Sequence, residues 1–163
     1  MQYSDARKEI RTGDILTWKH EECDNIEDLK IQFVRIFTRS EYSHTGIAWV
    51  VGERVFVLEA VKPMVRIFPL SKLLPFYWIQ MDKELTYKSL EKALSMVGYE
   101  YGEMEAIKGF FRRNDRENKI TECAEYVRVV MMENESLPDG TDTPTHIVDD
   151  AMNLNHPMIK VTQ

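Results

Sequence analysis

The chain has 163 residues, of which 44% are hydrophobic and 29% charged, so residues 1–163 can bury the core of one globular domain. The formal net charge of −6 argues against a nucleic-acid-binding surface, because such surfaces rely on lysine and arginine. No apolar stretch approaches the roughly 20 residues of a membrane span, and the segment after Met1 lacks the apolar core of a signal peptide. We therefore expect a cytoplasmic protein without a transmembrane segment.

Hydrophobic periodicity predicts a mixture of strands and helices. Period-two alternation predicts strands, and apolar residues three and four positions apart predict helices. No clear pattern covers residues 99–119. In chain order we expect a strand over 11–18, a helix over 26–40, strands over 44–51, 54–61, 64–70 and 75–81, helices over 85–98 and 121–132, a short helix over 145–153 and a strand over 158–163. This order favours an α+β fold, an antiparallel sheet packed against helices.

The two strands over 44–51 and 54–61 form the clearest hairpin. The loop between them is Gly52-Glu53, and a glycine at its first position fits a type II′ turn. Counting back from this loop pairs Gly46 with Glu59 and makes His44 a diagonal neighbour of Glu59 on the same face. The missing side chain at Gly46 leaves room for the imidazole to lean across. We therefore predict a hydrogen bond between His44 and Glu59.

Glu59 interrupts the apolar alternation of its strand, between Val57 and Val61. A carboxylate on an apolar face is expensive to bury unless it is paired. Two other readings stay open for Glu59: that this face is exposed to solvent, or that the carboxylate pairs with an arginine.

Cys123 lies in the first turn of the helix predicted over 121–132. Thr121 is a good N-cap, which puts the thiol at the second helical position, where the helix dipole favours the thiolate. The alternative is a core residue, because Cys123, Tyr126, Val127, Val130 and Met131 share one helical face. We expect Cys123 and Cys23 to be free thiols, because a cytoplasmic protein normally stays reduced.

Weaker candidates lie elsewhere in the chain. His20 and Cys23 sit in an acidic segment, but no second ligand pair accompanies them, so we expect no metal site. His146 and His156 carry no spacing signal. We expect Asp14 to serve a turn or a cap. The tyrosines that could line a substrate pocket are Tyr42, Tyr101 and Tyr126.

Five short motifs carry a family resemblance. In chain order they are Gly-Asp-Ile at 13–15, Ser-His-Thr-Gly-Ile at 43–47, Glu59 in its strand, Tyr-Glu-Tyr-Gly at 99–102 and Glu-Cys-Ala-Glu-Tyr-Val at 122–127. The order resembles the circularly permuted papain-like enzymes of the NlpC type, in the YaeF/YiiX-like branch, which are related to lecithin retinol acyltransferase-like proteins. In this branch the histidine strand precedes the cysteine helix. The chain departs from the family in having Ala124 where a serine is common, and we expect it to lack the export signal or lipoprotein anchor that many members carry.

The resemblance implies a permuted papain-like fold with the nucleophile at a helix N-terminus. It also implies Cys123 as nucleophile, His44 as base and Glu59 as the third polar residue. With the residues themselves, it predicts a cysteine hydrolase, a thiol protease or amidase, that cleaves a peptide or a peptidoglycan-type stem peptide through an acyl-enzyme and needs no cofactor.

Two other functions stay open. A lipid-directed acyltransferase or thioesterase could use the same site, and an apolar groove lined by Phe33, Phe37, Phe110 and Phe111 would favour it. The second open function is that of a catalytically inert binding module. The sequence sets neither the substrate, beyond a small peptide or acyl compound, nor the oligomeric state.

Overall fold

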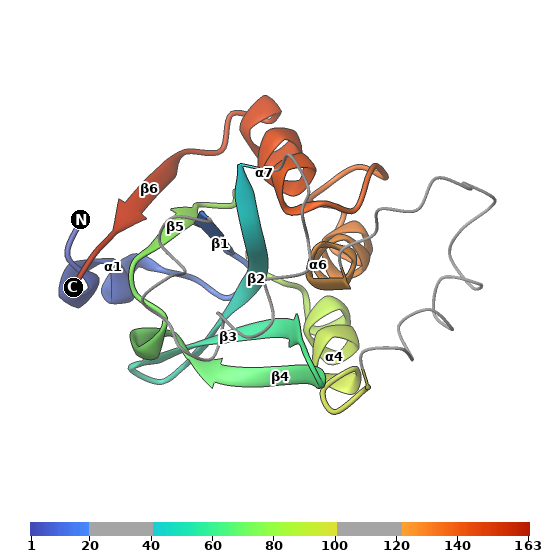
Figure 1. Cartoon of the computed structure of the whole chain (residues 1–163), viewed down its shortest axis with the longest axis horizontal. Helices are drawn as coiled ribbons and strands as arrows, with labels where there is room; N and C mark the ends of the chain where they lie inside the picture. Colours follow the sequence, from blue (N-terminus) through green and yellow to red (C-terminus); the bar gives the residue numbers. More distant parts are fainter. Residues whose placement is uncertain (20–40, 101–121) are drawn as a thin grey trace.

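The computed structural model describes residues 1–19, 41–100 and 122–163 (Figure 1). In this part of the chain the strands are β1 (Ile15–Lys19), β2 (Tyr42–Val51), β3 (Arg54–Val61), β4 (Met64–Pro69), β5 (Phe76–Ile79) and β6 (Met158–Val161). The helices there are α1 (Tyr3–Glu9), α4 (Tyr87–Ser95), α6 (Glu122–Glu133) and α7 (Pro144–Asn153), with the 3-10 helix η1 (Leu70–Lys72). The six strands form one antiparallel sheet in the order β4-β3-β2-β1-β5-β6. This confirms the predicted α+β class.

Helices cover one face of this sheet. Helix α6 packs against β2 and β3, α7 packs against β2, and α4 packs against α6. Figure 1 shows these three helices together on one side, with α1 and both chain ends on the other. The ends are joined by a backbone hydrogen bond of 3.0 Å from Thr162 N to Met1 O. In the described part of the chain, no helix is long and apolar enough to cross a membrane.

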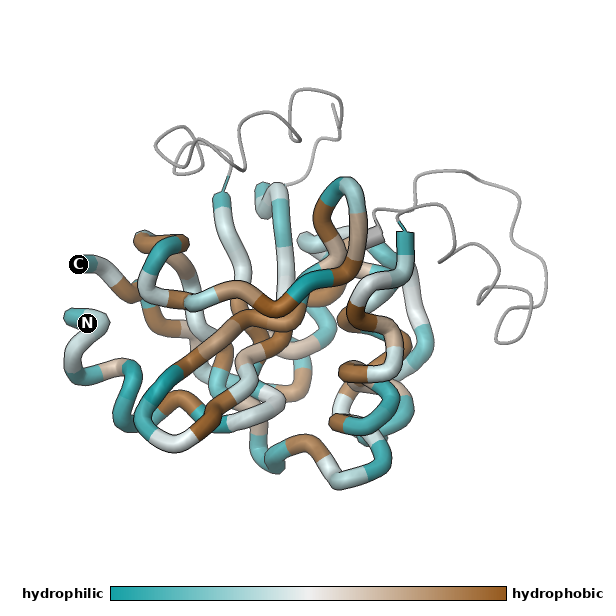
Figure 2. The backbone as a smooth tube through the Cα atoms, turned by 90° about the horizontal axis from the view of Figure 1, so that it is seen from below, coloured by the Kyte–Doolittle hydropathy of each residue, from teal (hydrophilic) through white to brown (hydrophobic). Residues whose placement is uncertain are grey.

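Two hydrophobic clusters occupy the two faces of the sheet. The helix-covered face buries Ile15, Ile47 and Leu58 against residues of α4, α6 and α7. The opposite face buries Leu16 and Ala48, among others. Neighbouring residues of one strand thus enter different clusters, as strand alternation requires. Figure 2 shows the hydrophobic segments gathered in the middle of the molecule and hydrophilic ones at many outer turns.

The β2–β3 hairpin has the predicted loop. Val51 pairs with Arg54, which leaves Gly52 and Glu53 between the strands. Gly52 has a positive φ of 58°, whereas the φ of Glu53 is not positive. A positive φ at the first loop position alone is the pattern of a type II′ turn.

The helices α4 and α7 start at side-chain caps. Thr86 accepts a hydrogen bond of 3.2 Å from Ser89 N, and Thr143 accepts one of 3.3 Å from His146 N. Such caps satisfy amide groups that have no partner within the helix. Helix α4 is shorter than the predicted 85–98, because a turn follows Ser95 and leads to Gly98, whose φ is 90°.

Other boundaries also differ from the prediction. Strand β2 begins at Tyr42 rather than 44, because a bulge near Ser43 lets the pairing with β1 continue: Trp18 pairs with His44, and Lys19 with Tyr42. No helix was predicted over α1. The predicted helix 26–40 and nearly all of segment 99–119 lie outside the described residues.

Arg128 holds the loop between α6 and α7 in place. Its guanidinium is 2% exposed and donates to Pro138 O at 2.9 Å and Thr141 O at 3.0 Å. It also forms an ion pair of 2.6 Å with Asp150 of α7. These contacts connect α6, the loop and α7, so Arg128 has a structural role.

Asp14 has the turn role expected from the sequence and two further contacts. Its Oδ2 accepts from Arg11 N at 2.9 Å and from Trp78 Nε1 at 2.8 Å. Its Oδ1 accepts from Met81 N at 3.0 Å. With 2% of its surface exposed, this side chain satisfies three donors where water is scarce.

We predict that Asp14→Asn destabilises the fold by about 3 kcal/mol in urea unfolding, because either orientation of the amide turns an NH2 group toward at least one buried donor. The control is Asp5→Asn on the exposed side of α1, which should change little. An Asp14→Asn protein as stable as the wild type would contradict this account.

Candidate active site

His44 and Glu59 meet across the β2–β3 hairpin. The Nε2 atom of His44 lies 2.7 Å from Oε2 of Glu59. The imidazole is 1% exposed and the carboxylate 0%. The hydrogen bond predicted from the register is therefore confirmed, and the reading of a solvent-exposed face is wrong, because both faces of the sheet are covered.

Gly46 permits the close approach of the two strands at this point. A Cβ atom there would lie 2.5 Å from Cγ2 of Val57, 3.0 Å from Leu58 O and 3.4 Å from Cβ of Glu59. The first distance is too short for two carbon atoms, so a larger residue would push β3 or its side chains away. The absence of a side chain at Gly46 thus sets how near His44 comes to Glu59.

Arg66 is a second partner of Glu59 that the sequence analysis did not name. It lies directly opposite Glu59 in the β3–β4 pairing, and its Nε donates to Oε1 of Glu59 at 2.8 Å. Glu59 therefore pairs with an arginine as well as with His44, so both of these predictions for Glu59 are confirmed. The signal was available: with Lys62 and Pro63 as a two-residue loop, register counting pairs residue 59 with 66.

Cys123 is the second residue of α6, as predicted, and Thr121 lies outside the described residues. It is a free cysteine and 2% exposed. Its sulfur interacts with the imidazole of His44 through a side-chain hydrogen bond. Because Nε2 of His44 is held by Glu59, the ring nitrogen left for the sulfur is Nδ1. The imidazole of His44 therefore lies between the thiol of Cys123 and the carboxylate of Glu59.

The surroundings of His44 favour its protonated form. Burial lowers the pKa of His44, but the charge and hydrogen bond of Cys123, followed by those of Glu59, outweigh it and raise the pKa to about 9. At neutral pH the ring is therefore an imidazolium between two acidic groups. A cation beside a cysteine is the usual condition for a reactive thiolate.

Glu59 is held in its ionised form. Burial raises the pKa of Glu59, but the hydrogen bond and charge of His44, and then those of Arg66, bring it below its ordinary value. Two cationic neighbours therefore offset the desolvation of one carboxylate.

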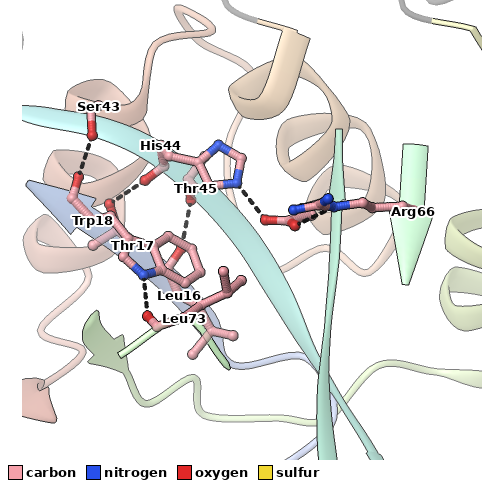
Figure 3. A network of polar contacts seen from close by, with 9 residues as sticks. Leu16, Thr17, Trp18, Ser43, His44, Thr45, Arg66 and Leu73 are labelled. Atoms are coloured by element: carbon pink, nitrogen blue, oxygen red, sulfur yellow. Dashed lines mark hydrogen bonds and ion pairs between the residues drawn. The ribbon is translucent and has the colours of Figure 1, made fainter. Parts of the chain in front are cut away.

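Backbone and ring contacts fix the position of His44 (Figure 3). Thr17 Oγ1 donates to the carbonyl oxygen of His44 at 2.8 Å. The Trp18 ring lies 5.2 Å from the imidazole, centroid to centroid, and its Nε1 donates to Leu73 O at 2.8 Å. The imidazole therefore has an apolar wall that is itself tied to the backbone.

Two of the three tyrosines predicted as binding residues, Tyr42 and Tyr126, have other contacts in the core. Tyr126 donates to Ala93 O at 3.1 Å, and burial raises its pKa far above the ordinary value. The Tyr42 hydroxyl lies 3.6 Å from the sulfur of Met158, and its ring packs edge-on against Tyr77. Tyr101 lies outside the described residues. A substrate-binding role for the three stays a prediction.

The weaker histidine candidates, His146 and His156, have partners other than the residues of the candidate site. His146 Nδ1 lies 2.6 Å from Thr143 Oγ1 at the start of α7, and His156 Nδ1 lies 3.5 Å from Oδ1 of Asp82. His20 and Cys23 lie outside the described residues. Within 1–19, 41–100 and 122–163, no three His, Cys, Asp or Glu side chains are grouped so that they could hold a metal ion.

Comparison with known proteins gives no match by sequence and a distant similarity among solved structures. The chain matches no protein family by sequence, and no curated protein matches it. Among solved structures it is similar to the metalloprotein YiiX from Escherichia coli O157:H7, with 22% sequence identity and a TM-score of 0.47. The match covers 76% of this chain and 66% of that chain, just under two thirds of its length.

Glu59→Gln should reduce stability at neutral pH by roughly 3 kcal/mol, because it leaves the buried His44 and the partly exposed Arg66 without their anion. It should also flatten the acid dependence. Since the folded pKa of Glu59 is lowered, its ionisation stabilises the fold above about pH 4.5, and this stabilisation is lost as the pH falls through the folded value. Urea unfolding between pH 7 and pH 3 measures both effects. The matched control is Glu53→Gln in the exposed hairpin loop, and equal pH slopes for all three proteins would refute the prediction.

Gly46→Ala should separate the strands at the site and destabilise the fold by about 2 kcal/mol. The effect specific to the site is a shift of the His44 imidazole NMR signal, because the added methyl group lies between Val57 and Glu59. Gly52→Ala in the same hairpin is the control: it is strained by its positive φ, yet meets no atom within 4 Å. An unchanged His44 signal in Gly46→Ala would show that this glycine does not set the contact.

Proposed function

We propose that the protein is a cysteine hydrolase that cleaves an amide bond of a peptide or peptidoglycan-type stem peptide. Cys123 is the nucleophile, His44 the general acid and base, and Glu59 the residue that orients the imidazole. The observation that carries this proposal is the buried series Cys123–His44–Glu59, in which the imidazole contacts both acidic groups. The order of the sequence motifs, which resembles permuted papain-like enzymes of the NlpC type, also supports it.

In the first half of the proposed reaction, the Cys123 thiolate attacks the substrate carbonyl carbon and forms a tetrahedral intermediate. The backbone N–H of Cys123, at the start of α6, is suited to stabilise the oxyanion. The imidazolium of His44 then gives its proton to the leaving amine, and the carbon–nitrogen bond breaks. The products are a thioester on Cys123 and a free amine.

In the second half, neutral His44 takes a proton from water, and the hydroxide attacks the thioester. The carboxylic acid product leaves, the thiolate returns, and His44 is again an imidazolium. Glu59 stays ionised throughout and stabilises the charged imidazole. The protein supplies every group that these steps need, so the proposed reaction uses no cofactor.

The second candidate function is an inert binding module. The observation that favours it is the burial of the site, with Cys123 2% and His44 1% exposed. A substrate would reach the sulfur only after covering groups had moved. A lipid-directed transferase shares the proposed site, but Phe33, Phe37, Phe110 and Phe111 lie outside the described residues.

The rate of Cys123 alkylation separates the enzyme from the inert module. In a Cys23→Ser background, which leaves one thiol, iodoacetamide should label Cys123 rapidly at pH 6 because the His44 imidazolium stabilises the thiolate. His44→Ala should slow this labelling at least about tenfold, whereas His146→Ala, at the start of α7, should not.

Each outcome is read by intact mass against time, with labelling in urea as the reference for an exposed thiol. If wild type and His44→Ala label at the same slow rate, the thiol is structural and the inert module is correct. If labelling depends on His44, peptide amides and acyl esters are tested next, and Cys123→Ala should abolish hydrolysis of both.

A further inference from the structure

Arg66 is a charged residue of the site that the proposed reaction leaves without a role. We propose that Arg66 is a positioning residue, which holds the Glu59 carboxylate ionised and turned toward His44 through the whole reaction. The inference rests on the proposed function, because it assigns a role within that same site.

The two oxygens of Glu59 are divided between two partners. Oε1 accepts from Arg66 Nε at 2.8 Å, and Oε2 lies 2.7 Å from His44 Nε2. Rotation of the carboxylate would break at least one of these contacts. Figure 3 shows the side chains of His44 and Arg66 pointing toward one another. Arg66 therefore fixes which oxygen faces the imidazole.

Arg66 is itself held in place from two directions. It stands opposite Glu59 in the β3–β4 register, so the backbone pairing brings the two side chains together. The guanidinium lies 4.4 Å from the ring centroid of Phe68, two residues further along β4. A cation over an aromatic face is an attractive contact. With 26% of the side chain exposed, Arg66 stays partly hydrated while its Nε reaches the buried carboxylate.

The charge of Arg66 matters most when His44 has lost its own. In the proposed reaction His44 is neutral after it protonates the leaving amine. At that stage Arg66 is the one cationic partner of Glu59 among the described residues. A buried carboxylate beside a neutral imidazole tends to take up a proton. An arginine is effectively always charged, so it prevents this uptake.

A protonated Glu59 would be a poor partner for the second half of the reaction. It could not stabilise the imidazolium that forms when His44 takes a proton from water. Arg66 therefore keeps the carboxylate ready for the return of the charge, although it need not touch the substrate.

The carbamidomethyl form of Cys123 allows a direct test, because alkylation makes the sulfur neutral, as in the acyl-enzyme. In fully alkylated protein, the Glu59 carboxyl carbon is titrated by NMR. Arg66→Met should raise the titration midpoint of Glu59, whereas Arg66→Lys, which keeps the charge, should leave it near the wild-type value. Arg54→Met, at the exposed far end of β3, is the matched control and should have no effect.

A second readout uses the unmodified thiol. Arg66→Met should slow iodoacetamide labelling of Cys123 at pH 6 by about tenfold, and Arg66→Lys should restore most of the rate. A merely structural arginine would change the urea midpoint but neither the Glu59 titration nor the labelling rate. Unfolding curves for every variant show which of them are folded, and Arg66→Gln replaces Arg66→Met if the latter is not.

The outcomes for the two proposals are distinct. If labelling depends on His44 but the Glu59 midpoint and the labelling rate are the same in Arg66→Met and wild type, the role of Arg66 is refuted and the proposed hydrolase stands. If labelling does not depend on His44 in the wild type, both fail.

Discussion

One buried carboxylate holds the candidate site together. Glu59 lies in the middle of three adjacent strands and contacts an imidazole from β2 and a guanidinium from β4. Desolvation of an ion at a site with no exposed surface is expensive, and it is tolerated because the partners are cationic and hydrogen-bonded. The same contacts fix the imidazole in position. Loss of Glu59 would therefore affect the fold and the chemistry together.

The helix-covered sheet brings the remaining group to this centre. Helix α6 packs on β2 and β3, and its second residue is Cys123, beside His44. The sulfur therefore lies beside the His44 imidazolium and at the N-terminal end of a helix. The apolar ring of Trp18 lies 5.2 Å from the imidazole, centroid to centroid. These features are the conditions for nucleophilic catalysis, and they support the proposed amide hydrolysis.

The hairpin and its consequences could be predicted from the sequence. A two-residue loop at Gly52-Glu53 sets the register, and the register brings His44 to Glu59. Arg66 follows from the same counting across the next loop.

Other features depend on tertiary contacts. Helix α1 has only seven residues. Ala6 within it and Ile10 directly after it are buried in the core, so packing rather than helix propensity stabilises α1. The bulge at Ser43 and the meeting of Cys123 with His44 arise from strand pairing and from helix packing, neither of which local pattern records.

The most direct measurement of the central claim is the NMR titration of the His44 imidazole in wild type and in Cys123→Ser. If His44 and Cys123 form an ion pair beside Glu59, the wild-type ring stays protonated until about pH 9, and its midpoint falls when the sulfur is replaced by a hydroxyl that does not ionise in this range. A wild-type midpoint near the ordinary value of about 6.5, unchanged in Cys123→Ser, would contradict the account and leave Cys123 as a residue of the core.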